Sequence, residues 1–226
     1  MISGPPGLSI PRLNGCYTVR MIAVDVETTG LAPEKASIVS LGAVDLDDPS
    51  NQFYEECQIW DGAHITSEAL AVTGMTREEI GEGSGKQSEA DLVRNFIAWA
   101  MDRPHDHTFV GQNPRFDSGF VEAACHRAGI EFPFAHRTID THTLCWMHLA
   151  ERGQPLPVKN KRSDINLDYI LTYTGVPPEP RPHNALNGAL SHAEVFFRLV
   201  YSKKTLPEFL AYPIPWLTNN NSETLA

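Results

Sequence analysis

The stretch Val24-Asp25-Val26-Glu27-Thr28-Thr29-Gly30 ends an apolar run that begins at residue 19. Its β-branched and apolar residues predict a central strand, and Gly30 ends that strand. Side chains alternate along a strand, so Asp25 and Glu27 project from the same face. Unpaired buried charge is costly, and oxygen-only ligands favour Mg²⁺ or Mn²⁺ as the neutralising ion. Taken alone, the pair is equally consistent with two solvated acids on an edge strand.

Two later stretches supply partners for these acids. Asn113-Pro114-Arg115-Phe116-Asp117 follows an apolar strand over 108–112, and Pro114 suits the first position of a helix. Asp117 then lies in the first helical turn, near the carboxyl end of the strand, where the sites of α/β folds gather. His183-Asn184-Ala185-Leu186-Asn187-Gly188-Ala189 opens a further helix that runs to about Tyr201.

These stretches resemble the motifs of the DEDDh family of 3′→5′ exonucleases, which includes the epsilon proofreading subunit of bacterial replicative polymerase, RNase T and oligoribonuclease. Asp25 and Glu27 match its first motif, Asp-x-Glu-Thr. Asn113, Phe116 and Asp117 match its second, Asn-x-x-Phe-Asp. The resemblance covers about residues 19 to 201, with the motifs in the family's order.

The third motif of the family, His-x-Ala-x-x-Asp, is matched only in part. His183 and Ala185 agree with it, whereas Gly188 takes the place of the Asp. Three groups could take the place of the missing carboxylate: the neutral amide oxygen of Asn187, a water molecule, or His192, which points nearly the same way one helical turn further on. Glu194 points in another direction and is a poor candidate. The leading expectation is that nothing replaces the carboxylate and that cleavage is slow. Gly188→Asp is then expected to restore the ligand without harm to folding, because Gly costs about 1 kcal/mol against Ala in a helix.

The resemblance implies phosphodiester hydrolysis with two Mg²⁺ or Mn²⁺ ions roughly 3.5–4 Å apart. Asp25 would bridge the ions, Glu27 would bind the ion on the nucleophile's side, and Asp117 would support the other through water. His183 would take a proton from the attacking water, and its proline-rich approach over 177–182 is a segment that can swing over substrate. The candidate substrate-binding residues are Thr28, Gly30, Leu31, Asn113 and Phe116, although an apolar residue beside a motif is more often core.

Periodicity along the chain predicts the fold class. Strands are expected over 19–27, 38–46 and 52–60, followed by alternating helices and strands up to a last helix over 184–201. This order predicts an α/β, RNase H-like fold with a mixed five-stranded sheet flanked by helices. Residues 1–16 form an expected flexible N-terminal arm, residues 17–202 the exonuclease domain, and residues 203–226 an irregular C-terminal tail. Phe209 and Trp216 would let that tail dock on the body or on a partner.

Composition indicates the number of domains and the cellular environment of the protein. At 226 residues and 42% hydrophobic content, one domain with a full core is expected. The four cysteines show no zinc or Cys-x-x-Cys spacing, and no apolar stretch reaches the ~20 residues of a membrane span. We therefore expect a cytoplasmic protein with reduced thiols and no membrane partner.

The net charge of −10 disfavours a passive binder of long duplex nucleic acid. The excess of acids lies in residues 1–102, whereas residues 103–226 are balanced. Arg152, Lys159, Lys161 and Arg162 form a basic run that either grips a phosphate backbone or is simply solvated. An enzyme that holds only the end of a strand through metal ions does not need a basic surface.

The expected function is a metal-dependent 3′→5′ exonuclease that releases nucleoside 5′-monophosphates from single-stranded DNA or RNA ends. A nuclease-derived module that binds a 3′ end, or a polymerase, without cutting is the first rival, and Gly188 favours it. A small-nucleotide hydrolase is the second, which the chain-length dependence of the products would distinguish. Single-stranded 3′ ends are the expected ligand, and a DNA polymerase or another replication or repair protein is the candidate protein partner.

Overall fold

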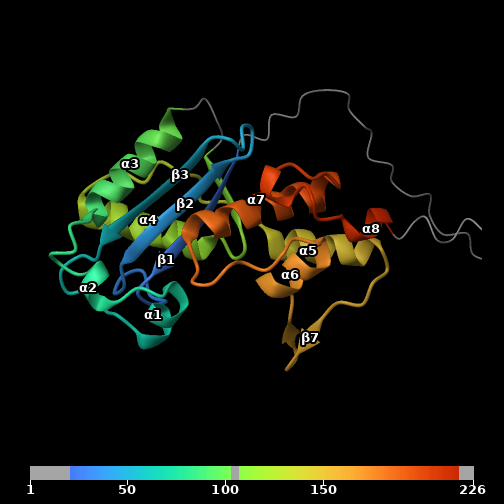
Figure 1. Ribbon diagram of the computed structural model, residues 1–226, viewed down its shortest axis with the longest axis horizontal. Coiled ribbons are helices and arrows are strands. Elements are labelled where there is room, and N and C mark those ends of the chain that lie inside the picture. Colours follow the sequence, from blue (N-terminus) through green and yellow to red (C-terminus); the bar gives the residue numbers. More distant parts are fainter. Residues whose placement is uncertain (1–20, 103–106, 219–226) are drawn as a thin grey trace, which may run out of the picture.

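The computed structural model describes residues 21–102 and 107–218, so the predicted arm over 1–16 lies outside the described residues (Figure 1). The central sheet has six strands in the order β4-β3-β2-β1-β5-β6. β1 pairs antiparallel with β2 and parallel with β5, so the sheet is mixed. The strands are β1 (Met21–Thr28), β2 (Ile38–Asp45), β3 (Gln52–Gln58), β4 (Gln87–Ser88), β5 (Thr108–Gly111) and β6 (Ile139–Asp140).

Helices flank this sheet and complete the fold. They are α1 (Ser67–Thr73), α2 (Arg77–Ile80), α3 (Glu89–Met101), α4 (Arg115–Ala128), α5 (Thr141–Glu151), α6 (Leu167–Thr174), α7 (Ala185–Tyr201), the 3₁₀ helix η1 (Pro207–Phe209) and α8 (Pro215–Thr218). The predicted fold class is confirmed. The sheet gains β4 beside the five predicted strands, because two residues are too few to show an alternating pattern.

The two faces of the sheet carry separate cores. Ile22, Val24 and Val26 of β1 pack with α3 and α4 on one face. Ala23 packs with α5, α6 and α7 on the other. Because side chains alternate, Asp25 and Glu27 belong to the face that α7 covers, as their spacing predicts.

Helix α7 reaches the sheet at very close range. It packs against β1 and β2 and crosses both strands in Figure 1. A Cβ built on Gly42 of β2 would lie 2.2 Å from the carbonyl oxygen of Ala185, so only glycine permits this approach. The first turn of α7, with Gly188, is thereby placed over the end of β1.

A buried ion pair fastens the C-terminal segment. Arg198 of α7 is fully buried, and its Nε lies 2.7 Å from Oε1 of Glu194. The same guanidinium donates to carbonyl oxygens of Phe209 and Tyr212 at 3.0 and 3.2 Å. Phe209 and Trp216 are buried, so of the two docking alternatives this segment takes the body. The described part, 203–218, contains η1 and α8, while residues 219–226 lie outside the described residues.

The basic run at 159–162 forms a small hairpin. β7 (Val158–Lys159) and β8 (Arg162–Ser163) pair antiparallel, and the hairpin projects from the body at the bottom of Figure 1. Asn160 and Lys161 have φ values of 50° and 60°, which suit a two-residue hairpin turn. Over the described ranges, no helix has the length and apolar character to cross a membrane.

Candidate active site at the carboxyl ends of β1 and β5

Three predicted acids meet where β1 ends. Asp25 and Glu27 come from β1, and Asp117 comes from the first turn of α4. The pairing of β1 with β5 runs only as far as Ala23, so the backbone beyond it is open towards α4. Asp117 Oδ1 accepts a 3.0 Å hydrogen bond from the Val26 N–H, between the two β1 acids. This bond joins α4 to β1 at the site.

Burial and like charge act together on these carboxyl groups. Desolvation raises the pKa of Asp25 well above its ordinary value, and Asp117, Glu27 and Glu179 raise it further. Desolvation raises the pKa of Glu27 to about 7, with Glu179 adding to the rise. Desolvation likewise raises the pKa of Asp117 to about 7, against the hydrogen bond from Val26. The protein alone therefore disfavours three ionised carboxylates here.

Glu179 is an acid of the site that the sequence interpretation missed. It lies in the proline-rich segment between α6 and α7, and its charge acts on both Asp25 and Glu27. Its side chain is only 7% exposed. A lone glutamate among prolines has no periodic signal. No local pattern in the sequence identifies it, because its contact with His183 four residues later is seen only in the structure.

His183 lies directly before the N-cap of α7. Its Nδ1 is 3.5 Å from Oε2 of Glu179, and its side chain is 29% exposed. Its backbone N–H donates to the carbonyl oxygen of Val72 at 3.2 Å, which ties the segment to the end of α1. Asn184 caps α7 by accepting hydrogen bonds from Leu186 and Asn187. Glu179 thus links His183 to the β1 acids, whereas the proposed contact of His183 with water or substrate stays a prediction.

Gly188 lies against Asp25, and this changes one expectation. A Cβ built on Gly188 would be 2.3 Å from Oδ2 and 2.6 Å from Cγ of Asp25. The Asp25 carboxyl group occupies the space that a side chain at position 188 needs, so the prediction that Gly188→Asp leaves folding unharmed now depends on a shift of Asp25. Asp25 would have to turn away before a carboxylate could be accommodated at position 188.

The other candidate replacements lie elsewhere or are neutral. His192 is buried against Val24 and Gly111, with its Nδ1 3.3 Å from the Val24 carbonyl oxygen. Burial lowers the pKa of His192 to about 4, although the hydrogen bond with Val24 and the charge of Asp140 act to raise it. Glu194 faces the C-terminal segment and pairs with Arg198, as its predicted direction implies. Asn187 keeps only its neutral amide.

A cavity of about 400 Å³ opens beside Glu27. Most of the predicted substrate-binding residues line it, namely Thr28, Gly30, Leu31 and Phe116, together with residues of α1. Leu31 is 86% exposed, so its apolar side chain is available to a ligand. Thr28 Oγ1 donates to the Gly30 carbonyl oxygen at 2.8 Å and fixes the turn after β1.

Asn113, the fifth candidate substrate-binding residue, is not among the residues that line this cavity; it holds the loop before α4. Its φ of 53° lies in the left-handed region that asparagine tolerates. Its N–H donates to Asp140 Oδ1 at 3.2 Å, and its carbonyl oxygen accepts from the Phe116 N–H at 2.9 Å. Asp140 also caps α5, because its side chain accepts a hydrogen bond from the His142 N–H. These bonds set where α4 begins and hence where Asp117 lies.

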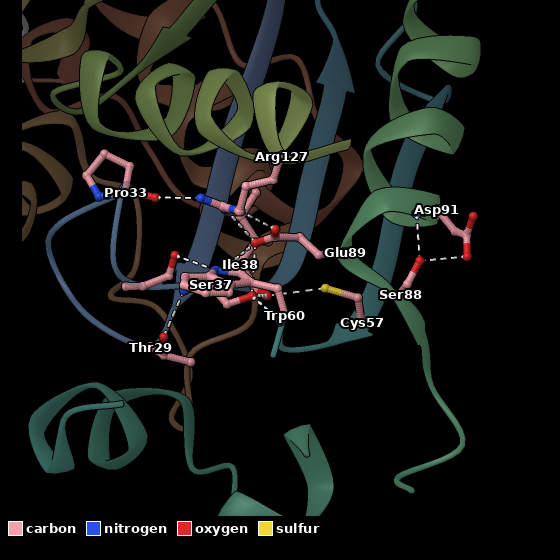
Figure 2. Close-up of polar contacts among 11 residues, drawn as sticks. Thr29, Pro33, Ser37, Ile38, Cys57, Trp60, Ser88, Glu89, Asp91 and Arg127 are labelled. Atoms are coloured by element: carbon pink, nitrogen blue, oxygen red, sulfur yellow. Dashed lines mark hydrogen bonds and ion pairs between the residues drawn. The ribbon is translucent and has the colours of Figure 1, made fainter. Parts of the chain in front are cut away.

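A buried network braces the loop between β1 and β2 (Figure 2). Glu89 accepts hydrogen bonds from Ser37 Oγ and the Ile38 N–H, each at 2.9 Å. Arg127 of α4 grips the same carboxylate through Nε and Nη2, also at 2.9 Å. Its Nη1 donates to the Pro33 carbonyl oxygen at 2.8 Å. Leu31 and the cavity wall are therefore carried by a fixed loop.

The donor set suits a hard divalent cation. Within the two described ranges, no three Asp, Glu, His or Cys side chains are already placed around one point as a metal site. Yet the acids are all oxygen donors, which Mg²⁺ and Mn²⁺ prefer. Glu179 Oε1 is buried without a hydrogen-bond partner in the described structure. A cation would satisfy that oxygen and relieve the repulsion between the carboxylates.

Comparison with known proteins agrees with the fold and with the family resemblance. Ribonuclease T of Yersinia pseudotuberculosis (serotype O:1b) is 27% identical over 221 residues, which cover 90% of this chain and 92% of that protein. The PolC-type DNA polymerase III of Thermotoga petrophila is 27% identical over 188 residues, which cover 82% of this chain. This match spans only 12% of the polymerase.

Solved structures show the same architecture. The nuclease domain of 3′hExo, a DEDDh family member bound to rAMP, superposes with a TM-score of 0.63 and 16% identity, covering 82% of this chain and 94% of that one. E. coli Exonuclease I in complex with a dA16 oligonucleotide superposes with a TM-score of 0.62 and 17% identity, covering 81% of this chain and 41% of that one. A model of the exonuclease family that includes RNase T matches residues 22–196. The chain therefore belongs to this family, the DEDDh-type 3′→5′ exonucleases.

Proposed function

We propose that the chain is a metal-dependent exonuclease that removes nucleoside 5′-monophosphates from the 3′ ends of single-stranded DNA or RNA. The observation that carries this proposal is the meeting of Asp25, Glu27 and Asp117 at the end of β1. The cavity beside Glu27 supports it, because its apolar wall of Leu31 and Phe116 suits a terminal base. A nucleotide bound there would present its phosphate to the carboxylates.

The acids would hold two Mg²⁺ or Mn²⁺ ions, with Asp25 between them, Glu27 on the nucleophile's side and Asp117 on the other. When bound, the ions supply positive charge at the phosphate and lower the pKa of a bound water. Glu27 and Asp117 have pKa values raised to about 7, so near neutral pH they ionise when a cation is present to favour the charged form.

His183 would act as the general base. It would take one proton from the attacking water, whose oxygen bonds to phosphorus as the bond to the 3′ oxygen of the preceding nucleotide breaks. That oxygen gains a proton and leaves as a 3′ hydroxyl, so each cycle shortens the strand by one nucleotide. Glu179, paired with His183 Nδ1 at 3.5 Å, would orient the ring.

Several features bear on the substrate and setting. The exposed hairpin with Lys159, Lys161 and Arg162 would contact phosphates of a longer strand. The likeness to Ribonuclease T favours RNA and that to the PolC-type polymerase favours DNA and a polymerase partner, so both substrates belong in the test. Cys57, Cys125 and Cys145 are buried free thiols, in keeping with a reducing cytoplasm.

The test is a digestion of labelled single-stranded DNA and RNA of several lengths with Mg²⁺ or Mn²⁺. We expect nucleoside 5′-monophosphates as the product, identified by chromatography against standards. Equal rates for dinucleotides and long strands would indicate a hydrolase of small nucleotides instead. Products that carry 3′ phosphates would contradict the proposed bond cleavage.

Gly188 favours one second candidate, a module that binds a 3′ end without cutting it. The missing carboxylate leaves one ion with fewer protein ligands, and Mg²⁺ demands near-ideal octahedral ligation. This candidate predicts tight strand binding with no product in either metal. Slow cleavage that is faster with Mn²⁺ than with Mg²⁺ is the outcome expected of the enzyme.

A further inference from the structure

Gly188 leaves the third motif without its carboxylate, and the segment before α7 carries a buried acid, Glu179, beside His183. We propose that Glu179 replaces the missing acid and is a direct oxygen ligand of the divalent ion that Asp25 and Glu27 bind. This inference rests on the proposed metal-dependent function. It assigns the fourth carboxylate to the segment before α7 instead of to α7 itself.

The first support is the state of the Glu179 side chain. It is 7% exposed, and its Oε1 has no hydrogen-bond partner within the described residues. Its Oε2 lies 3.5 Å from His183 Nδ1, which leaves the other oxygen available. An unpaired buried carboxylate oxygen costs free energy unless something compensates for it, and a hard cation is the ligand that such an oxygen fits.

The second support is the location of Glu179. Its partner His183 is bonded through the backbone to Val72, and Val72 lines the same cavity as Glu27. In keeping with this location, the charge of Glu179 acts on Asp25 and on Glu27, although Glu179 follows β1 by some 150 residues. The neighbouring acid Asp168 adds like charge, not compensation. Four carboxylates gathered in this way repel one another, and a divalent cation turns that repulsion into attraction.

The third support is the way the segment is anchored. A Cβ on Gly74 would lie 2.7 Å from Cβ of Pro182, so the segment packs closely on the end of α1. The His183 N–H donates to Val72 at the same place. These contacts hold the stretch that carries Glu179 near the end of β1. At the same time the Asp25 carboxyl group lies against Gly188 of α7, in the space where a side chain at position 188 would lie.

Glu179 has a simpler role to be tested against, that of orienting His183 alone. The two roles differ in what they do to metal binding. A ligand contributes to the affinity for Mn²⁺ whether or not His183 is present, whereas an orienting residue affects only proton transfer. Glu179→Gln removes the charge and keeps the shape, so it is the decisive variant.

The experiment is a calorimetric titration of Mn²⁺ into the full chain, Glu179→Gln, His183→Ala and the double variant. We expect Glu179→Gln to weaken Mn²⁺ binding by about tenfold or more, with or without His183, and His183→Ala alone to leave it unchanged. Glu151→Gln, an exposed acid at the end of α5, is the matched control and should bind as the parent does. Thermal melts in EDTA should show that Glu179→Gln is at least as stable as the parent, because it loses a buried charge.

The outcomes separate this inference from the proposed function. If Asp25→Asn abolishes Mn²⁺ binding and Glu179→Gln leaves it unchanged, Glu179 is not a ligand, while the metal site stands. If Glu179→Gln weakens binding only when His183 is present, Glu179 acts on the metal through His183 and is not itself a ligand, and the inference fails. If the parent binds no Mn²⁺, or binds it equally after Asp25→Asn, both proposals fail.

Discussion

The carboxyl group of Asp25 lies against Gly188, so close that a Cβ on Gly188 would be 2.3 Å from Asp25 Oδ2. One residue is the acid on which the proposed metal site centres, and the other is the position where the family's motif has an aspartate. Gly188 therefore has no side chain to bind a metal ion, and it also leaves the space that the Asp25 carboxyl group occupies. The two positions are coupled, and a change at one acts on the other.

Gly188→Ala tests this coupling through stability. When Asp25 is intact, the methyl group of Gly188→Ala meets the Asp25 carboxyl group, and such overpacking costs about 1–3 kcal/mol of stability. That cost opposes the gain of about 1 kcal/mol that alanine brings to a helix. We expect Gly188→Ala to destabilise the metal-free parent more than an Asp25→Ala background, where Oδ2 and Cγ are gone and only the Cβ at 3.1 Å remains. Urea denaturation of the four proteins measures the difference, and equal effects in both backgrounds would rule out the coupling.

The raised carboxyl pKa values predict a pH dependence of stability. Glu27 and Asp117 rise to about 7 from ordinary values of 4.5 and 3.8. At pH values between these ordinary pKa values and about 7, the unfolded chain has released protons that the folded chain keeps. The free energy of unfolding therefore falls as pH rises through this range. Buried His148 and His192, whose pKa values burial lowers to about 4, act in the opposite direction. The comparison must therefore be made between variants.

Asp117→Asn isolates one of these carboxyl groups. Its amide oxygen still accepts the Val26 N–H, so the fold keeps its link between β1 and α4. In EDTA we expect Asp117→Asn to melt near the parent temperature at pH 5 and several degrees above it at pH 8, since only the parent ionises there. A difference in melting temperature that does not change with pH would show that Asp117 is not held protonated by its surroundings.

His183→Ala tests the general base. Loss of a positioned base costs about 10²–10⁴-fold in rate. We expect a loss of this size in the release of mononucleotides, with Mn²⁺ affinity unchanged. The exposed His136 in the loop before β6 offers a matched control, and His136→Ala should cut at the parent rate. If His183→Ala is as fast as the parent, another group removes the proton.

Arg127→Ala tests the brace of the substrate loop. It leaves Glu89 buried among Ser37 and Ile38 without its cation, and breaking a buried pair in this way costs about 3–5 kcal/mol. Arg94→Ala, which breaks the exposed pair of Arg94 with Asp91, is the control and should have little effect. Urea denaturation gives both values. Equal stabilities of the two variants would mean that the network in Figure 2 does not hold the loop.

The parts of the fold that sequence reasoning predicted are those with a local pattern. The alternation along β1 gives the common face of Asp25 and Glu27. The position of Asp117 shortly after Pro114 places it in the first turn of α4. Each of these signals is local, because the residues that produce it are neighbours in the chain.

The parts that were missed depend on contacts between distant segments. Glu179 joins the site only because its segment packs on α1, and no pattern near Glu179 encodes that contact. The packing of Asp25 on Gly188 likewise depends on how closely α7 approaches β1. The docking of Phe209 follows from the buried guanidinium of Arg198, a residue that looks like an ordinary solvated arginine in the sequence.

The proposed exonuclease site is tested most directly by digesting a 5′-labelled single strand with the parent and with Asp25→Asn, each with Mn²⁺ and with EDTA. We expect a ladder that shortens one nucleotide at a time from the 3′ end, only for the parent and only with Mn²⁺. Asp25→Asn should fold, bind the strand and leave it intact. A ladder of the same rate from Asp25→Asn, or one that persists in EDTA, would contradict the claim that these carboxylates form a metal-dependent exonuclease site.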